Sequence, residues 1–271
     1  MEPGTSFREP SGNDALALRL LRTNTWSCYC GLALWGFTPE RLKEIMLGML
    51  SDLPDSAGRK PRLLSRPCNV LGVHDRPGQE AFFCVAGPGS QKPHAAGLVH
   101  CDEEVSLVFL SGTPTSRAFV ASQLGSCFGV TLYALLLAPW QLSMAMVWGR
   151  SCLEPEESSE EHSLEVNMDG IILGFSCTQV LSSLPRSRSI TADEGRNLLL
   201  ALCKHAAKAV LGYRYQELRL CSVHFLNLFF LDREGTMRVH KNRLVPEFFK
   251  FLLTFAKQAV LSTPPDDLEE E

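Results

Sequence analysis

The 271 residues predict a mixed α/β (α+β) fold of two packed halves, each a mostly antiparallel sheet with amphipathic helices on it. Three observations predict this fold. Short apolar runs of strand length recur along the chain, some joined by turn residues such as Asp169-Gly170. Helix starts with a capping residue precede segments of helical apolar periodicity. An abruptly acidic segment, 153–162, divides the chain into two parts.

The composition predicts where these parts begin and end. The start of the chain is rich in proline, glycine and serine, which is typical of a loosely ordered terminus. We expect a disordered lead-in at 1–13, an N-terminal α/β half at 14–152, an acidic linker at 153–162, a C-terminal α/β half at 163–262 and an acidic tail at 263–271.

The chain is organised around residues 104–150. Val105–Leu110 is typical of a buried strand. Thr113-Pro114 then predicts a helix start, because a threonine hydroxyl caps helices well and a proline at the first helical position loses no hydrogen bond.

The segment 118–149 contains no charged side chain, so it forms either a protein core or a bilayer span. Pro139 divides the run, and several serine, threonine and glutamine side chains dilute it. We therefore predict a buried helix from Pro114 to about Ala138 and a second short element from Trp140 to Trp148. A membrane-anchored protein that spans through residues 118–149 is an alternative.

The other elements of the N-terminal half follow from shorter patterns. The run 26–37 predicts a first strand, and Thr38-Pro39 predicts a helix that ends near Leu53-Pro54. Two short strands are expected at 70–73 and 81–85, joined by a turn at 75–78 and followed by a loop at 87–97.

The C-terminal half shows clearer signals. Thr191 and Glu194 form a capping box before a helical apolar face that includes Leu202, and Gly212 suits its end. The remaining expected elements are strands at 163–168 and 170–177, a long strand at 218–231, a turn at 232–235 and a return strand at 236–240.

A final helix begins at Pro246 and is apolar over most of its circumference. Such a helix must be sandwiched, either inside this chain or against a partner. We predict that Phe248, Phe251 and Phe255 contact a protein partner.

A basic, proline-rich segment at 55–69 contains the candidate anion-binding residues Arg59, Lys60, Arg62 and Arg66. This patch is suited to a phosphate, an anionic lipid or an acidic partner; a solvated loop is the alternative. The formal net charge of −4 gives no reason to expect nucleic-acid binding.

Three possible chemical sites contain cysteine or histidine. Cys28 and Cys30 have the spacing C-x-C with no helix start after them, so a redox role is not expected. His94, His100, Cys101 and Cys84 could join them around zinc, but the spacings fit no pattern of paired ligands. His205 and His224 have no candidate nucleophile beside them in the sequence. We expect structural cysteines, no metal and no cofactor.

The ten cysteines and the absence of a secretory signal pattern indicate a reducing, cytoplasmic location. Common nucleotide-binding, hydrolase and zinc-protease motifs do not occur in the sequence.

The strand 104–110, the long apolar helix after it and Pro139-Trp140-Gln141-Leu142 resemble the latter part of a longin-type domain, as in multi-longin subunits of vesicle-trafficking and planar-polarity complexes. The C-terminal half is similar in its element order. The resemblance implies a non-catalytic scaffold that binds a small GTPase or a second longin-like subunit and contacts membranes only peripherally. The helix at Thr38 departs from the family's order.

The sequence therefore predicts a non-catalytic adaptor or scaffold subunit of a cytoplasmic complex, in vesicle trafficking or small-GTPase regulation. An enzyme of an unfamiliar family that uses a cysteine or a histidine is the other alternative.

Overall fold

The structure is a computed structural model, and it describes residues 25–49, 68–72, 80–86, 93–152, 162–185, 191–209, 218–225, 228–241 and 244–261. Within these residues the fold is mixed α/β, as predicted, and every strand pairing is antiparallel. The predicted lead-in, the tail, the turn at 75–78, Gly212 and all of the acidic linker except His162 lie outside the described residues.

The described strands form one 11-stranded sheet with the order β2-β3-β4-β5-β1-β11-β10-β9-β7-β8, and β6 pairs with β1. Their bounds are β1 Trp26–Leu32, β2 Cys68–Gly72, β3 Glu80–Ala86, β4 Pro93–Cys101, β5 Val105–Gly112, β6 Tyr133–Ala134, β7 His162–Met168, β8 Ile171–Ser176, β9 Leu220–Phe225, β10 Phe229–Asp232 and β11 Thr236–Val239. We call β2 to β1 in this order the N-terminal half-sheet and β11 to β8 the C-terminal half-sheet.

The continuous sheet differs from the predicted pair of sheets. The two half-sheets join where Trp26 pairs with Met237 and Ser27 with Thr236. The turn after β10 accepts two further hydrogen bonds: Cys28 N of β1 donates to Gly235 O (3.0 Å), and Leu137 N, in the segment between β6 and α4, donates to Arg233 O (2.8 Å). The first and the last strand of the sheet in chain order therefore meet in its middle.

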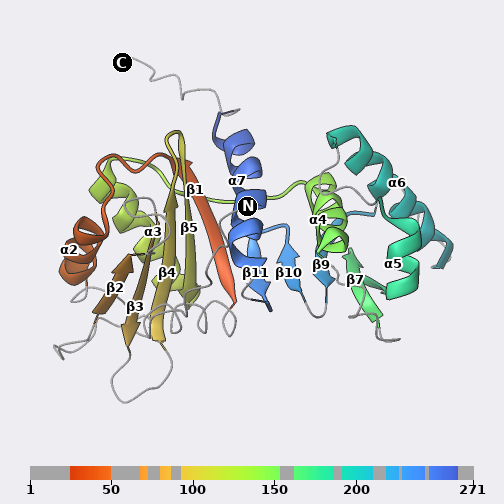
Figure 1. The fold of residues 1–271 in the computed structure, drawn as a ribbon, viewed down its shortest axis with the longest axis horizontal. Helices are drawn as coiled ribbons and strands as arrows, with labels where there is room; N and C mark the ends of the chain where they lie inside the picture. The colour runs from red at the N-terminus through yellow and green to blue at the C-terminus, as the bar shows by residue number, and fades with distance from the viewer. Residues whose placement is uncertain are drawn as a thin grey trace, which may run out of the picture.

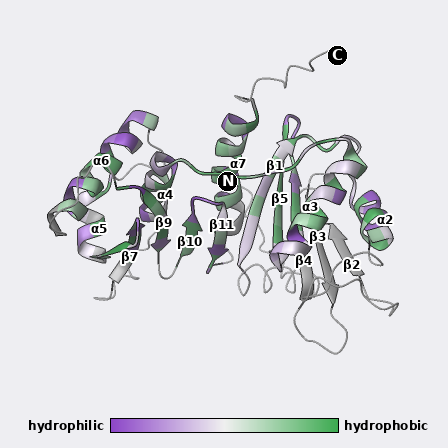
Figure 2. Ribbon diagram, turned by 180° about the vertical axis from the view of Figure 1, so that it is seen from behind, coloured by the Kyte–Doolittle hydropathy of each residue, from purple (hydrophilic) through white to green (hydrophobic). Residues whose placement is uncertain are grey.

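Helices cover the two faces unequally (Figures 1 and 2). The helices are α2 Pro39–Met49, α3 Pro114–Phe128, α4 Pro139–Ser151, α5 Cys177–Ser183, α6 Ala192–Ala209 and α7 Val245–Leu261. On the front face, α7 packs on the N-terminal half-sheet, α4 and α5 pack on the C-terminal half-sheet, and α6 packs on α4. On the rear face, α2 and α3 enclose a second core with β4 and β5.

The central segment forms α3, the short strand β6 and α4, and α4 contains the predicted second element from Trp140 to Trp148. Thr113 Oγ1 accepts a hydrogen bond from Ser116 N (3.2 Å), which confirms the predicted cap, and Pro114 follows it. The predicted extension to Ala138 is wrong: Gly129 adopts the left-handed conformation (φ 67°), which glycine favours, and ends the helix. Among the described helices, none has the length and apolar character that a bilayer span requires.

Local turn and cap chemistry explains the elements that were predicted correctly. Asp169 (φ 50°) and Gly170 (φ 90°) form a two-residue turn between β7 and β8. Thr191 N donates to Glu194 Oε2 (2.7 Å) and Glu194 N donates to Thr191 Oγ1 (3.3 Å), which confirms the capping box of α6. The predicted strand 218–231 is instead two strands, β9 and β10, and helix α5 was not predicted.

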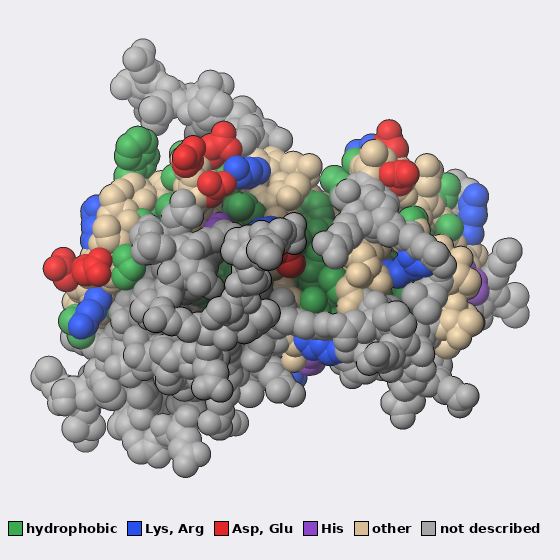
Figure 3. Space-filling model, in the orientation of Figure 1, with side chains coloured by type: hydrophobic (Ala, Val, Ile, Leu, Met, Phe, Trp, Pro, Cys, Tyr) green, Lys and Arg blue, Asp and Glu red, His purple; other side chains and the backbone are tan. Residues whose placement is uncertain are grey.

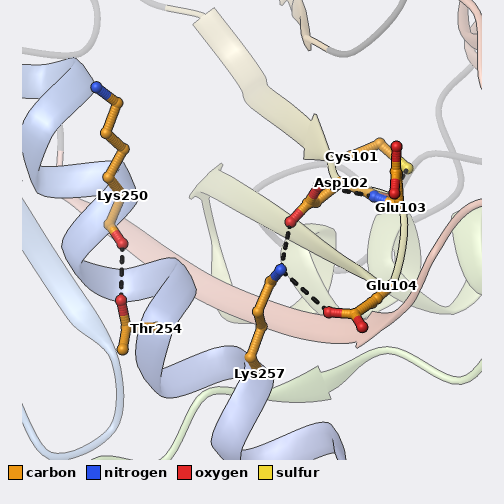
Figure 4. Close-up of polar contacts among 7 residues, drawn as sticks. All are labelled: Cys101, Asp102, Glu103, Glu104, Lys250, Thr254 and Lys257. Atoms are coloured by element: carbon orange, nitrogen blue, oxygen red, sulfur yellow. Dashed lines mark hydrogen bonds and ion pairs between the residues drawn. The ribbon is translucent and has the colours of Figure 1, made fainter.

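Helix α7 packs on the sheet and beside α4 of the same chain. The Phe249 ring stacks on Phe109 of β5 at 4.4 Å, and Phe248 lies 5.1 Å from the Trp148 ring of α4. Near its end, Lys257 Nζ lies 2.7 Å from Asp102 Oδ2 and 3.1 Å from Glu104 Oε2, in the β4–β5 turn (Figure 4). The intramolecular alternative for this helix is therefore the correct one.

Candidate functional site

A cavity of about 180 Å³ opens between α5 and α6. We call it the α5–α6 pocket. Its floor is apolar and is built from α4, β7, β8 and both helices. The lining residues are Met146, Leu164, Phe175, Gln179, Val180, Ser183, Leu184, Leu198, Ala201, Leu202 and His205.

Two capping boxes hold the walls of the pocket. At the start of α5, Ser176 N donates to Gln179 Oε1 (2.9 Å) and Gln179 N donates to Ser176 Oγ (3.3 Å). The box at Thr191 fixes the start of α6 in the same way. Because each box satisfies backbone donors that the first turn leaves open, the two helices are held at defined starting points on either side of the cavity.

The interior and the rim of the pocket differ in chemistry. Val180, Leu184 and Leu202 are buried in the interior, whereas Gln179, Ser183, Ala201 and His205 are exposed at the rim. Among the described residues that line the pocket, none is a carboxylate, a lysine or an arginine. The Gln179 amide oxygen holds the helix cap, but its NH2 group takes no part in that bond. The site therefore offers an apolar interior with hydrogen-bonding side chains around its mouth.

The volume limits what can enter. An apolar cavity of roughly 150 Å³ holds a molecule of the size of benzene. Pockets for drug-sized ligands and cofactors span roughly 300–1,000 Å³. The α5–α6 pocket thus fits one large apolar group, such as a leucine, methionine or phenylalanine side chain, rather than a whole cofactor.

A row of mainly polar side chains lies on the rear face of the C-terminal half-sheet. Glu165, His224, Phe230 and Arg238 are cross-strand neighbours on β7, β9, β10 and β11. His224 Nδ1 lies 3.7 Å from Glu165 Oε2, and its ring lies 5.9 Å from that of Phe230. No group of three histidine, cysteine, aspartate or glutamate side chains in the described part of the chain is arranged to hold a metal ion. This row suits contact with water or with a hydrated surface.

The cysteine pair of β1 is buried and protonated. Burial raises the pKa of the Cys30 thiol to about 11, and burial followed by the nearby Cys30 raises the pKa of Cys28 well above its ordinary value. Both thiols therefore lack the thiolate that nucleophilic or redox chemistry needs at neutral pH. Their packing in the front core agrees with a structural role.

The zinc hypothesis also meets a geometric obstacle. Cys30 and His100 are both cross-strand partners of Leu107, on opposite sides of β5. Two strand spacings separate their Cα atoms by roughly 10 Å, and the fully buried Leu107 lies between them. Cys101 belongs to the rear core, on the other face of the sheet.

The predicted partner contacts on α7 need correction. Phe248 and Phe255 are 0% and 1% exposed, so they form the core instead of a docking surface. Phe251 is half-buried and stacks on Trp148 at 5.5 Å. The predicted basic patch of Arg59, Lys60, Arg62 and Arg66 lies outside the described residues. On the face drawn in Figure 3, the described acidic and basic side chains lie next to one another rather than gathering by sign.

The pocket itself was not predicted. Only His205, among its lining residues, was considered as a site residue, and it lies at the rim, 5.9 Å from the Phe175 ring. The signal that could have revealed it is the Ser176–Gln179 capping box, which starts a helix directly after the second strand of a hairpin.

Comparison of the chain with known protein families and with curated proteins finds no significant match to either.

Proposed function

We propose that the chain is a non-catalytic adaptor or scaffold subunit of a protein complex, and that the α5–α6 pocket takes one large apolar side chain of a partner protein. The observation that carries this proposal is a cavity of about 180 Å³, the size of one such side chain, with an apolar floor and a polar rim. Binding hot spots in protein complexes are buried anchor side chains in pockets, surrounded by polar contacts that exclude water.

The chemistry of the rim defines the partner further. Gln179, Ser183 and His205 supply hydrogen-bonding groups at the mouth. A partner segment with unpaired backbone groups beside its apolar anchor, such as a turn or the end of a helix, fits such a rim. A strongly charged anchor does not, because burying it in an apolar cavity leaves its charge unpaired.

The resemblance to longin-type domains supports the same class of function and extends it. From β7 to α7 the elements are a hairpin, a helical region, further antiparallel strands and a long apolar helix, which is the kind of element order on which the likeness of the C-terminal half was based. We therefore extend the proposal to a cytoplasmic complex in vesicle trafficking or small-GTPase regulation, with a small GTPase or a second longin-like subunit as partner and only peripheral contact with membranes.

The test fills the pocket from its rim. In Ala201→Phe a phenyl ring occupies the cavity from an exposed position on α6. The control is Ala118→Phe, which makes the same change at an exposed position on α3, outside the pocket. Both tagged proteins are expressed in cells beside the wild type, and the proteins that co-purify in stoichiometric amounts are quantified by mass spectrometry.

We expect Ala201→Phe to lose a stoichiometric partner that the wild type and Ala118→Phe retain, while both variants melt at the wild-type temperature. Retention of every partner by a folded Ala201→Phe protein would show that the pocket does not bind them. Equal loss in both variants would point to a general effect of added apolar surface and would also count against the pocket.

A further inference from the structure

Strand β8 forms one end of the described sheet, so one of its edges has no described neighbour. Natural edge strands are usually protected by charged residues, prolines or bulges, because an open edge pairs with other strands. The six residues of β8, Ile171 to Ser176, include no charge and no proline. Ile172 and Gly174 of β8 are both exposed, and Ile172 is 67% exposed.

The hairpin geometry shows which backbone groups this edge offers. In a two-residue hairpin the residues that flank the turn exchange both hydrogen bonds, here Met168 and Ile171. Alternate residues of β8 from Ile171 onward therefore bond to β7. The N–H and C=O groups of Ile172 and Gly174 then point away from the sheet. Ser176 N is already used, because it donates to Gln179 Oε1.

We propose that β8 pairs in antiparallel fashion with β8 of a second copy of this chain, with a two-fold axis through Leu173. In this register Ile172 lies opposite Gly174 of the second copy, and Gly174 lies opposite its Ile172. Both are outward-facing residues, so each pair exchanges two backbone hydrogen bonds. The register therefore uses every backbone group that Ile172 and Gly174 present.

The side chains of β8 match this register as well. The exposed Ile172 side chain covers the bare backbone of Gly174 in the other copy. Ile171 lies opposite Phe175, a β-branched and aromatic pair of the kind that stabilises antiparallel strands. No charge meets a like charge within the paired strands, so nothing opposes self-association there. These two reciprocal pairs favour a second copy over an unrelated strand.

The paired segment is short, which sets the strength of the association. The turn at Gly170 and the cap at Ser176 limit the pairing to about five residues on each copy. Such a contact buries less than the roughly 1,200 Å² typical of stable complexes. We therefore expect a reversible dimer that dissociates on dilution. This proposal does not rest on the pocket, and its test uses no pocket variant.

The experiment is sedimentation velocity of the full chain over a dilution series up to about 1 mM, followed by variants of Ile172. Ile172→Lys and Ile172→Glu each place a charge diagonally across from its own copy, within reach of a long side chain. We expect each variant alone to weaken dimerisation at least about tenfold, and an equimolar mixture of the two to form a heterodimer. Leu200→Lys, at another exposed apolar position on α6, is the control and should dimerise like the wild type.

The pairing of opposite charges separates this arrangement from other forms of association, because only a contact that brings residue 172 near its own copy is rescued by mixing. A wild-type chain that stays monomeric over the whole series, equal weakening by Leu200→Lys, or a mixture that remains monomeric would each overturn the proposal.

Discussion

The two half-sheets differ in how many of their faces are covered. In the N-terminal half-sheet, α7 packs on the front and α2 and α3 on the rear, so the first six residues of β5 are all buried. In the C-terminal half-sheet, α4 and α5 pack on the front, and no described helix contacts the rear in a comparable way. Strands β10 and β11 alternate there between buried and more exposed residues. Figure 2 shows this uncovered rear face.

The comparison shows that the pattern of apolar and polar residues in a strand indicates how many of its faces are covered by helices. Val105 to Leu110 is a nearly continuous apolar run because both of its sides face a core. In β9 to β11, positions such as His224, Phe230 and Arg238 alternate with core residues. This alternation in the sequence indicates that the rear face of these strands is not buried. A run of apolar residues therefore indicates two covering layers, and alternation indicates one.

The largest expected effect comes from placing the same charge on the rear face of each half-sheet. Val108→Lys buries an unpaired ammonium at a position that is 0% exposed and should prevent folding. Ser222→Lys is at a half-buried rear position opposite Asp232, and should change the free energy of unfolding by no more than about 0.5 kcal/mol. Circular dichroism and thermal melting measure both. Loss of folding in Ser222→Lys would mean that the rear of the C-terminal half-sheet is covered after all.

A smaller effect is expected at the β1–β11 junction, where the half-sheets meet. Gly235 and Gly129 have similar positive φ angles, 69° and 67°, so alanine is strained at both by about 1–2 kcal/mol. At Gly235 the new Cβ would also clash with the Leu135 carbonyl oxygen, whereas at Gly129 it would meet open space. In chemical denaturation, Gly235→Ala should therefore be clearly less stable than Gly129→Ala. Equal stability of the two would show that the junction tolerates rearrangement.

The smallest effect concerns the ion pairs of Lys257, which hold α7 to the N-terminal half-sheet (Figure 4). The hydrogen bond from Lys257 is the main cause that lowers the pKa of Asp102. The pKa of Lys257 is raised, mainly by Asp102 and then by Glu104. The ion pairs therefore stabilise the fold between these two pKa values. Their stabilisation is lost when the pH falls through the lowered pKa of Asp102, and also when the pH rises through the raised pKa of Lys257.

Lys257→Gln should accordingly lower the melting temperature slightly at neutral pH, and the difference from the wild type should shrink in strong acid and in 1 M salt. Lys250→Gln, which removes a local pair with Glu247 within α7, is the matched control. A difference that persists unchanged in acid would exclude the ion pairs as its cause.

Local chemistry made much of the fold predictable. Thr113-Pro114, Asp169-Gly170 and the Thr191 capping box each act within a few residues, and the structure has a helix start or a turn at each of them. The continuous sheet could not be predicted, because it depends on the pairing of Trp26 with Met237, which no local pattern signals. The predicted helix was too long because the uncharged run continues past Gly129, the residue that ends the helix.

The candidate site was harder to predict than the fold. The α5–α6 pocket depends on α5, a helix of seven residues, which is too short for its apolar residues to show a helical period. Phe248 and Phe255 were correctly identified as strongly apolar positions on a sandwiched helix, but their sequence cannot distinguish a partner from the α4 helix and β5 strand of the same chain.

The position of β1 in the middle of the sheet has a consequence for synthesis on the ribosome. Its partner β11 follows about 210 residues later, so at roughly 5–20 residues per second the Trp26-Ser27 part of the β1 edge, which β6 does not pair, stays open for roughly 10–40 s. Helix α7, which covers the front of β1 and β5, emerges later still. The nascent N-terminal half-sheet therefore exposes both a strand edge and an apolar face during that time, which is the kind of surface that molecular chaperones bind.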